Sequence, residues 1–387
     1  MKQVYLDNAA TTPVRLEVEV AMRPYFCEKY GNPSGVYQMS SENRGMIENV
    51  REQIAKTLNA SAEEIYFTSG GTEGDNWAIF GTAYGYKRSG KHIITTNTEH
   101  PAINLPLEAL KEEGFEIEKI GVDEKGYIDI EELKSKIRKD TILVSVILAN
   151  NETGTVQDIE KIGQAVKEAN NDTLLHADAV QAFGKMKIDV KNSKIDMLSA
   201  SGHKFGAPRG TGIFYMKKGL KVKPLMYGGG QQLNQRSGTE NVAGAAAIAK
   251  AAEVCYKNLE ENNEKIREIK KYIADRVFTE IPNTFINGDS IEKASPYVLN
   301  IGFMGLRSEV LLHALEAEGI YVSAGSACNS KKKVRSSVLS AMGKSDEEIE
   351  GSIRLSFSKF NTMEEAEYAV EKLKEQAALL RRFNRKR

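Results

Sequence analysis

The sequence predicts an α/β protein built on a mostly parallel sheet, with a smaller α+β domain towards the C-terminus. Three observations support this fold class. Between about residue 45 and residue 177, short apolar runs alternate with stretches of helical periodicity. One run, Ile142–Leu148, is continuously apolar and rich in β-branched residues, as strands buried on both faces are. The chain of 387 residues also exceeds the usual size of one domain, so two domains are expected.

The elements of the larger domain follow one another along the chain. Apolar residues at helical spacing predict a helix at Met46–Leu58. The next expected elements are a strand at Ile65–Thr68, a glycine-rich turn and a helix that begins near Asn76. They are followed by a strand at Ile93–Thr96, a helix around Pro106–Glu113, and strands at Ile142–Leu148 and Leu174–Ala177. Parallel sheets bind ligands beyond the carboxyl ends of their strands, so the residues after each strand are the candidates for a site.

The C-terminal third predicts the smaller domain. A long helical stretch at about Ala243–Ile273 connects it to the larger one. The expected elements beyond it are a strand at Tyr297–Phe303, a helix at Ser308–Glu318, a strand at Ile353–Phe357 and an amphipathic helix from Met363. We expect the larger domain at 14–255 and the smaller domain at 1–13 and 256–387, with the loop around Cys328 in the smaller one.

Composition narrows the function. Lys plus Arg and Asp plus Glu both number 53, so no overall field attracts nucleic acid or an anionic membrane. No apolar run approaches the ~20 residues of a membrane-spanning helix, and the N-terminus lacks the apolar region of a signal peptide. Cys27, Cys255 and Cys328 are too widely spaced for a zinc ribbon and fit free thiols in a reducing compartment. We therefore expect a cytoplasmic protein without a metal site, a membrane partner or a direct nucleic-acid partner.

A glycine-rich turn follows the first predicted strand. Gly70 and Gly71 precede a helix, whose free backbone N–H groups can bind an anion, and Thr72 adds a hydroxyl group. The stretch is neither a P-loop nor a dinucleotide-binding fingerprint, because the required lysine and glycine spacings are absent. Taken alone, a purely structural turn explains it equally well.

Further polar groups follow the other strands. His100 can stack on a planar ring, Asn151 can donate and accept hydrogen bonds, and Asp178 can pair with a protonated ring nitrogen. Lys204 lies in a small, polar turn, Ser199–Gly206. Each group alone is also explained by an ordinary turn or strand end. An anion cradle, a ring stacker, an aspartate and a turn lysine together are the parts that a pyridoxal phosphate site requires.

Cys328 has an unusual setting. The stretch Ser323–Ser330 surrounds it with small polar residues, and Lys331–Lys333 follow directly. Nearby cations favour the thiolate, which is the nucleophilic form of cysteine. The pattern predicts either a reactive thiol or an ordinary surface loop.

Taken jointly, the motifs resemble the cysteine desulfurases of the class V aminotransferase family, which are pyridoxal phosphate enzymes of fold type I. The resemblance runs from Tyr5–Pro13 to the strand that carries Arg354. The matching motifs include Thr-Glu-His at 98–100, His-x-Asp-Ala-x-Gln at 176–181, Ser-x-His-Lys at 201–204 and Arg-Ser-Gly-Thr-Glu-Asn at 236–241.

The resemblance implies a role for each candidate residue. Lys204 would join the cofactor covalently, His100 would stack on its ring, and Asp178 would pair with its pyridine nitrogen. Cys328 would be catalytic, together with Lys204 and His100. The residues implied to bind the cofactor are Gly71, Thr72, His100, Asn151, Asp178, Gln181, Ser201, His203, Lys204 and Thr239. Thr239 would reach the phosphate of a neighbouring subunit, which implies a homodimer. Asn151 and Arg354 would hold the substrate carboxylate, a group that the arginine fork matches bidentately.

The implied activity is conversion of L-cysteine to L-alanine, with the sulfur left as a persulfide on Cys328. An acceptor protein in iron–sulfur cluster assembly or tRNA thiolation would then take the sulfur. The loop departs from the desulfurase pattern at Ala324, which replaces a serine, and in the basic run Lys331–Lys333. That run would either dock an acceptor or lower the pKa of Cys328. The alternatives are a selenocysteine lyase, another pyridoxal phosphate lyase or transaminase, and a sulfur-relay binding protein without a working cofactor site.

Overall fold

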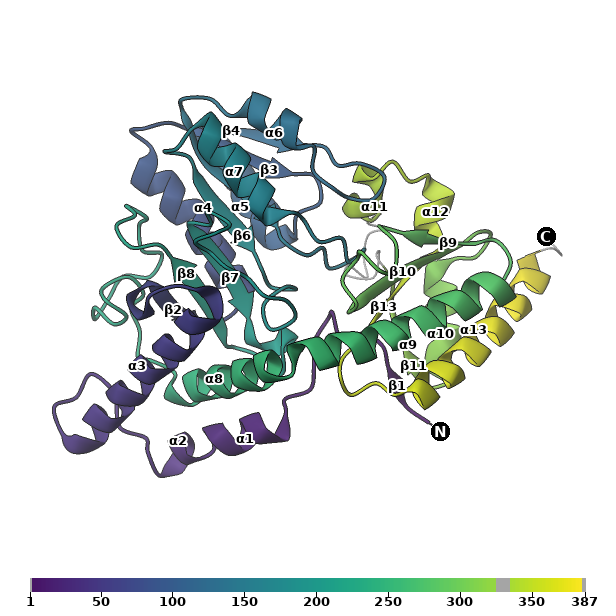
Figure 1. Ribbon diagram of the computed structural model, residues 1–387, viewed down its shortest axis with the longest axis horizontal. Coiled ribbons are helices and arrows are strands. Elements are labelled where there is room, and N and C mark those ends of the chain that lie inside the picture. The colour runs from purple at the N-terminus through teal and green to yellow at the C-terminus, as the bar shows by residue number, and fades with distance from the viewer. Residues whose placement is uncertain (1, 325–334, 385–387) are drawn as a thin grey trace.

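The computed structural model describes residues 2–324 and 335–384 (Figure 1). Its largest sheet has seven strands in the order β2-β8-β7-β6-β5-β3-β4. Their bounds are Ile65–Thr68 (β2), His92–Thr96 (β3), Glu116–Ile120 (β4), Thr141–Ile147 (β5), Leu174–Asp178 (β6), Met197–Ser201 (β7) and Gly212–Met216 (β8). Strand β8 runs antiparallel to β2 and β7, and the other neighbours are parallel. The predicted mostly parallel sheet is confirmed.

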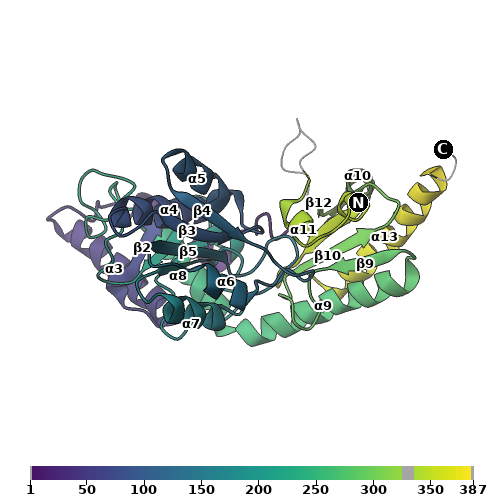
Figure 2. The same ribbon diagram turned by 90° about the horizontal axis from the view of Figure 1, so that it is seen from above.

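Helices cover both faces of this sheet (Figure 2). Their bounds are Leu16–Met22 (α1), Pro24–Cys27 (α2), Gln38–Leu58 (α3), Gly71–Tyr86 (α4), Pro101–Glu112 (α5), Ile130–Lys136 (α6), Ile159–Ala169 (α7) and Val242–Lys257 (α8). One apolar core joins the sheet to α3, α7 and α8, and a second joins it to α4 and α5. The sheet is thus buried on both sides, as its continuous apolar strands predict.

Helix α9 (Leu259–Glu280) follows α8 and leads to the C-terminal part (Figure 1). There a four-stranded antiparallel sheet has the order β12-β13-β10-β9, and β1 pairs with β11. The bounds are Val4–Tyr5 (β1), Thr284–Asn287 (β9), Val298–Phe303 (β10), Ile320–Tyr321 (β11), Ser323–Ala324 (β12), Ser352–Ser356 (β13), Ser308–Ala317 (α10), Ser337–Ala341 (α11), Asp346–Glu350 (α12) and Met363–Asn384 (α13). A separate core contains Val4 and Leu6 together with residues between 266 and 377. The domain boundaries at 14–255 remain a proposal.

The direction of the strands determines where the site lies. Because β8 is antiparallel to both β2 and β7, the strand β2 points the same way as β3, β5, β6 and β7. The segments that follow Thr68, Thr96, Ile147, Asp178 and Ser201 therefore meet at one edge of the sheet.

Two helices begin earlier than predicted. Helix α4 starts at Gly71 rather than near Asn76, because its glycines lower the helical signal without preventing a helix. Helix α5 starts at Pro101, with His100 as N-cap, so Pro106 lies inside it. A proline there removes the usual donor to the carbonyl of Ala102. The side chain of Asn76 supplies a replacement, since its Nδ2 lies 3.3 Å from that oxygen.

Other boundaries also differ from the prediction. The expected single helix at about Ala243–Ile273 is two helices, because Asn258 leaves the helical conformation between α8 and α9. The predicted turn Ser199–Gly206 begins as the end of β7, and Gly202–Lys204 forms a 3₁₀ turn. Strands β4, β7 and β8 were not predicted. The edge strand β4 (Glu116–Ile120) is mostly polar, which makes the apolar pattern of a strand hard to recognise in its sequence.

Gly163 and Gly45 form a matched pair for a test of packing. Gly163 is buried in α7, and a Cβ there would overlap the carbonyl oxygen of Ser193. Gly45 is exposed in α3 and has no atom within 4 Å of that position. We expect Gly163→Ala to lower the free energy of unfolding by about 1–3 kcal/mol, because overpacking outweighs helix propensity. Gly45→Ala should raise it by roughly 0.5–1 kcal/mol. Thermal unfolding of both variants checks this, and equal shifts would contradict it.

Candidate active site

A cavity of about 620 Å³ opens at the carboxyl edge of the large sheet. This volume is in the range of small-molecule sites. Its lining includes these predicted residues: Gly71, Thr72, His100, Asn151, Asp178, Gln181, Ser201, His203, Lys204 and Arg354. It also includes Asp7, Ala9, Ala10, Asp75, Glu152, Asn300 and the strand residues Ser323 and Ala324. The sheet and the smaller antiparallel sheet thus both contribute walls.

Lys204 reaches the cavity from the 3₁₀ turn after β7. Its Nζ lies 2.6 Å from the carbonyl oxygen of Ala9 and 2.8 Å from that of Ala10. Both carbonyls belong to the N-terminal segment, so this segment and the turn hold the amine at the cavity wall. A primary amine in this setting can form a covalent bond to an aldehyde.

His100 lies across the cavity at the start of α5. Its Nδ1 accepts a hydrogen bond from the backbone N–H of Ala102 at 3.1 Å. Burial and the nearby Lys204 lower the pKa of His100, so the ring is neutral near pH 7. A neutral ring that accepts at Nδ1 carries its proton on Nε2. The imidazole can therefore stack on a planar ring and donate a hydrogen bond from Nε2.

The start of α4 forms an anion cradle. No side chain caps this helix, and its first N–H groups belong to Gly71, Thr72 and Glu73. Ser201 and His203 line the same corner of the cavity. A side chain at Gly71 would overlap Cγ2 of Val180, which explains why glycine occupies this position. The corner therefore offers backbone and hydroxyl donors to a phosphate group.

Asp178, at the end of β6, is buried beneath the cavity. Its Oδ1 accepts the N–H of Val180 at 2.9 Å. Burial raises the pKa of Asp178, while that hydrogen bond and Lys204 lower it. The pKa of neighbouring Asp75 is raised by burial and by the charge of Asp178. Two buried carboxyl groups cannot both ionise cheaply, so a protonated ring nitrogen would be a favourable partner for Asp178.

Gln181 is held by two partners. Its Nε2 donates to the carbonyl of Ala9 at 2.9 Å, and its Oε1 accepts from Lys185 Nζ at 2.8 Å. Lys185 thereby fixes which end of the amide faces the N-terminal segment. We did not single out Lys185 from the sequence, because its position four residues after Gln181 matches no recognisable motif.

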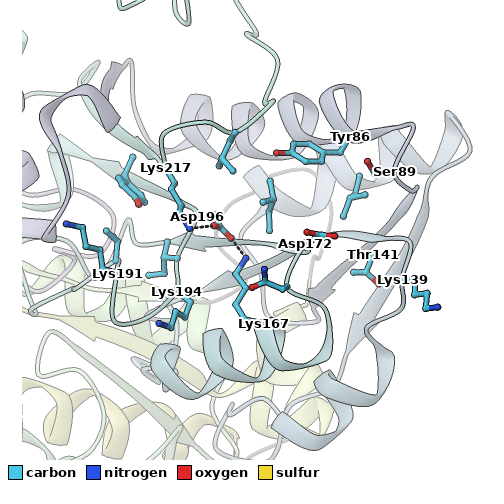
Figure 3. A pocket seen from close by; sticks show the side chains of 17 residues that line it. Tyr86, Ser89, Lys139, Thr141, Lys167, Asp172, Lys191, Lys194, Asp196 and Lys217 are labelled. Atoms are coloured by element: carbon cyan, nitrogen blue, oxygen red, sulfur yellow. Dashed lines mark hydrogen bonds and ion pairs between the residues drawn. The ribbon is translucent and has the colours of Figure 1, made fainter.

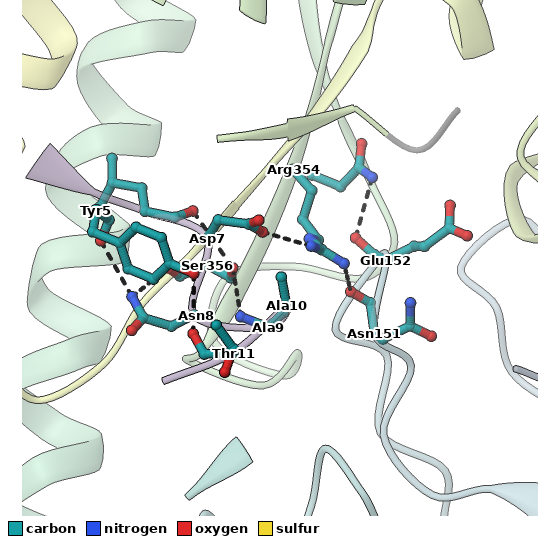
Figure 4. A network of polar contacts seen from close by, with 12 residues as sticks. Tyr5, Asp7, Asn8, Ala9, Ala10, Thr11, Asn151, Glu152, Arg354 and Ser356 are labelled. Atoms are coloured by element: carbon teal, nitrogen blue, oxygen red, sulfur yellow. Dashed lines mark hydrogen bonds and ion pairs between the residues drawn. The ribbon is translucent and has the colours of Figure 1, made fainter. Parts of the chain in front are cut away.

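Arg354 lies on β13 and is held by the N-terminal segment (Figure 4). Its Nη2 pairs with Asp7 Oδ1 at 2.6 Å, and its Nη1 donates to the carbonyl oxygen of Asn151 at 3.0 Å. Its buried Nε has no hydrogen-bond partner among the described residues. Asn151 therefore contacts Arg354 through its backbone. Arg354 lines the cavity and retains donors for a carboxylate.

Asp7 and Glu152 are acidic groups for which the sequence predicted no role. Asp7 orients Arg354, and Glu152 accepts a hydrogen bond from Ser336 Oγ at 2.6 Å. Burial raises the pKa of Glu152, while Ser336 and Arg354 lower it. The sequence feature that could have indicated a role for Asp7 is its position within the Tyr5–Pro13 motif. Only the three-dimensional fold shows that it lies beside β13.

Among the predicted residues that the structure describes, Thr239 does not line this cavity. Thr239 is exposed on a loop that Arg236 ties to Glu73 in α4, with Nε–Oε1 and Nη2–Oε2 separations of 2.8 and 3.1 Å. Cys328 and Lys331–Lys333 lie outside the described residues. The nearest described strand is β12, which lines the cavity and lies opposite Arg354 on β13.

The residues present fit pyridoxal phosphate. The cavity combines an open helix N-terminus, a buried carboxyl group with a raised pKa, a neutral imidazole and an amine. These groups match the phosphate, the ring nitrogen, the ring face and the aldehyde of the cofactor, respectively. When bound, this cofactor supplies an electron sink for negative charge at the Cα of an amino acid.

A larger cavity of about 770 Å³ lies at the opposite edge of the sheet and contains none of the predicted site residues (Figure 3). Buried Asp196 accepts ion pairs from Lys167 at 2.7 Å and Lys217 at 3.7 Å there. Those two lysines thus already have an anionic partner. Within residues 2–324 and 335–384, no group of three metal-ligating side chains occurs, and no helix is long and apolar enough to cross a membrane.

Known proteins resemble this chain over nearly its full length. Cysteine desulfurase IscS of Methanosarcina thermophila is 44% identical over 383 residues, which cover 99% of this chain and 94% of that protein. Cysteine desulfurase IscS of Clostridium botulinum is 44% identical over 373 residues, covering 96% of this chain and 94% of that protein. A solved NifS-like protein has a TM-score of 0.92 and 36% identity, covering 98% of this chain and all (100%) of that chain. The structure titled SspA in complex with cysteine has a TM-score of 0.82 and 31% identity, covering 93% of this chain and 100% of that chain.

The predicted fold type I is confirmed by these structural neighbours. A model of the Aminotransferase class-V family matches residues 4–369, which include every described residue of the cavity lining. Members of this family depend on pyridoxal phosphate. The chain therefore belongs to the class V aminotransferases, and its cofactor is pyridoxal phosphate.

Proposed function

We propose that this chain is a cysteine desulfurase that converts L-cysteine to L-alanine and leaves the sulfur as a persulfide on Cys328. The observation that carries the proposal is the meeting of Lys204, His100 and Arg354 around one cavity. In the sequence, Cys328 is the fourth residue after Ala324, which lies on the cavity wall. Relatives named cysteine desulfurase at 44% identity support the same reaction.

The chain's own residues supply the remaining chemistry. Arg354, oriented by Asp7, would bind the carboxylate of L-cysteine. Neutral His100 would stack on the cofactor ring and donate a hydrogen bond from Nε2 to the reacting substrate. The Cys328 thiolate would attack the substrate sulfur, so that an S–S bond forms and the substrate Cβ–S bond breaks. The carbon fragment retains the electron pair, takes up a proton and leaves as L-alanine.

A product assay tests this function. With L-cysteine and a thiol reductant, the holoenzyme should release alanine and sulfide in equal amounts. Formation of a keto acid instead would indicate a transaminase. Release of alanine from selenocysteine but not from cysteine would indicate a selenocysteine lyase.

Arg354→Ala should raise the KM for L-cysteine by about 10- to 100-fold, because charge-assisted hydrogen bonds to the carboxylate are lost. The visible spectrum of the bound cofactor should stay unchanged, since only a substrate contact is removed. Arg307→Ala is a matched control, because this arginine has a side chain 52% exposed and lies outside the cavity. Loss of the cofactor spectrum from Arg354→Ala would mean that Arg354 is structural.

We also propose that two copies of the chain form the working enzyme. Thr239 is exposed and is not among the residues that line the cavity of its own chain, which supports a role at the cavity of a second subunit. Large apolar side chains are also exposed, among them Leu16 at 73%, Phe26 at 60% and Tyr227 at 77%. Exposed apolar groups of this size are typical of interaction surfaces. Sedimentation of the holoenzyme should give a particle of two chains, and a fully active monomer would overturn the proposal.

The sulfur acceptor and the location are further proposals. We propose an acceptor protein of iron–sulfur cluster assembly or of tRNA thiolation, in the cytoplasm. The names of the relatives support sulfur transfer, and the widely spaced thiols support a reducing compartment. Trapping the persulfidated enzyme with candidate acceptors tests the proposal.

A further inference from the structure

A third, much smaller cavity lies where the N-terminal segment, α8 and the segment after β13 meet. Its volume is about 30 Å³. Its lining includes Arg15, Lys185, Lys204, Cys255, Tyr297 and Lys359. A space of this size accommodates one or two water-sized particles.

Arg15 is the most unusual member of the lining. Its relative exposure is 8%, and neither Nε nor Nη1 has a hydrogen-bond partner among the described residues. Its Nη2 donates to Cys255 Sγ at 3.2 Å. A guanidinium group stays charged at all accessible pH values. A buried charge without an anionic partner is costly, so the two open donors indicate a missing ligand.

Three lysines, Lys185, Lys204 and Lys359, border the same space. Lys185 is 8% exposed, and its Nζ interacts with Gln181 Oε1 at 2.8 Å and with the ring of Tyr297 at 5.2 Å. Burial lowers the pKa of Lys185 to about 7 and also lowers the pKa of Lys359. Burial of positive charge is the main cause of both shifts, and the charge of Arg15 adds to the shift of Lys359. Glu17 offsets part of the Lys359 shift, but this carboxylate is exposed and does not line the cavity.

The lining itself offers no anion to balance these charges. No Asp or Glu is among the described residues that border the cavity. Burial raises the pKa of the Cys255 thiol, and its Sγ lies 3.4 Å from the carbonyl oxygen of Phe205, so it acts as a neutral donor. Water in the cavity could solvate Arg15 but would leave its charge uncompensated.

We propose that this cavity binds one small inorganic anion of halide size, held by Arg15 and flanked by Lys185 and Lys359. The volume admits a chloride or bromide ion and is too small for a phosphate ester or an acidic side chain. The bound anion would link three segments that are far apart in the sequence, near Arg15, Cys255 and Lys359. It would therefore stabilise the folded chain in proportion to the free halide concentration. Lys204 borders this cavity as well as the active-site cavity, but the halide site does not depend on the proposed reaction and stands even if that proposal fails.

The first test is thermal unfolding of the holoenzyme in sodium chloride, sodium bromide or sodium gluconate at constant ionic strength. Above the dissociation constant, each tenfold increase in halide should raise the Tm by about 2 °C for a chain of this length. Gluconate is too large for the cavity and should give no such rise. Identical Tm values in halide and gluconate would overturn the proposal.

Variants locate the effect. Arg15→Met should abolish the halide-dependent rise in Tm, whereas Arg23→Met should keep it, because the Arg23 side chain is 68% exposed. Cys255→Ala should also keep the rise. If the rise appeared only in Cys255→Ala, the thiolate would be the native counter-ion and the proposal would be wrong. An unchanged rise in Arg15→Met would place the halide elsewhere and equally overturn it.

Crystals of the wild-type holoenzyme grown in bromide give a test that does not depend on a variant that folds. We expect an anomalous peak within about 3.5 Å of Arg15 Nε or Nη1. Density without anomalous signal at that position would identify water and overturn the proposal.

Discussion

Lys204→Ala should lack the visible absorption band of the bound cofactor and should lose at least about 10³-fold in L-cysteine turnover. The physical reason is the position of the amine. Lys204 Nζ stands at the cavity wall, held by the carbonyls of Ala9 and Ala10 at 2.6 and 2.8 Å. The cofactor can still occupy the anion cradle at Gly71, but no covalent bond to the chain forms there. Absorption spectra of the purified variant, with and without added pyridoxal phosphate, measure this.

Lys185 is the appropriate control, because it is the other buried amine near the cavity and its pKa is lowered to about 7. An amine with a low pKa is a chemical competitor for the aldehyde. Lys185 does not line the cavity, so Lys185→Met should retain the band. Borohydride reduction of the wild type followed by peptide mapping should place the label on Lys204. A label on Lys185, or a reducible band that persists in Lys204→Ala, would contradict the assignment.

The fold was predictable where local pattern and burial coincide. The buried strands β5 and β6 lie within one residue of their predicted bounds, because apolar residues make up most of β5 and begin β6. Strand β7 was not predicted, because Met197–Ser201 contains small residues and resembles a turn in the sequence. The start of α5 was misplaced for a different reason. Two prolines, Pro101 and Pro106, both suit a first helical position, and tertiary support from Asn76 decides between them.

The site was predictable from residue types that carry chemistry at the ends of strands. Lys204, Asp178 and His100 come from different strand ends, and the parallel sheet brings them together. Contacts between side chains that are far apart in the sequence could not be predicted from residue types. Asp7 reaches Arg354 across 347 residues of sequence, and Arg15 contacts Cys255 across 240. Such contacts depend on how the N-terminal segment packs, which no local pattern encodes.

Cys328→Ser should reduce alanine release by at least about 10³-fold, even with a thiol reductant present. Attack on sulfur needs a soft nucleophile that is partly ionised near neutral pH, and a hydroxyl group is neither. The groups proposed to bind L-cysteine and the cofactor, Arg354 and Lys204 among them, are untouched by this change. Addition of L-cysteine should therefore still alter the absorption spectrum of the variant. The two readouts together separate sulfur transfer from substrate binding.

Cys27→Ser is the matched control, because this cysteine is exposed at the end of α2 and lies outside the cavity. It should release alanine at the wild-type rate. Mass spectrometry of the wild type after a single turnover should find one additional sulfur atom on the peptide that contains Cys328. If Cys328→Ser kept the wild-type rate, or if the additional sulfur lay on Cys27 or Cys255, another group would accept the sulfur and the role of Cys328 would be refuted. Because alanine release requires the substrate Cβ–S bond to break, a spectral change without alanine is the outcome that isolates this thiol as the sulfur acceptor.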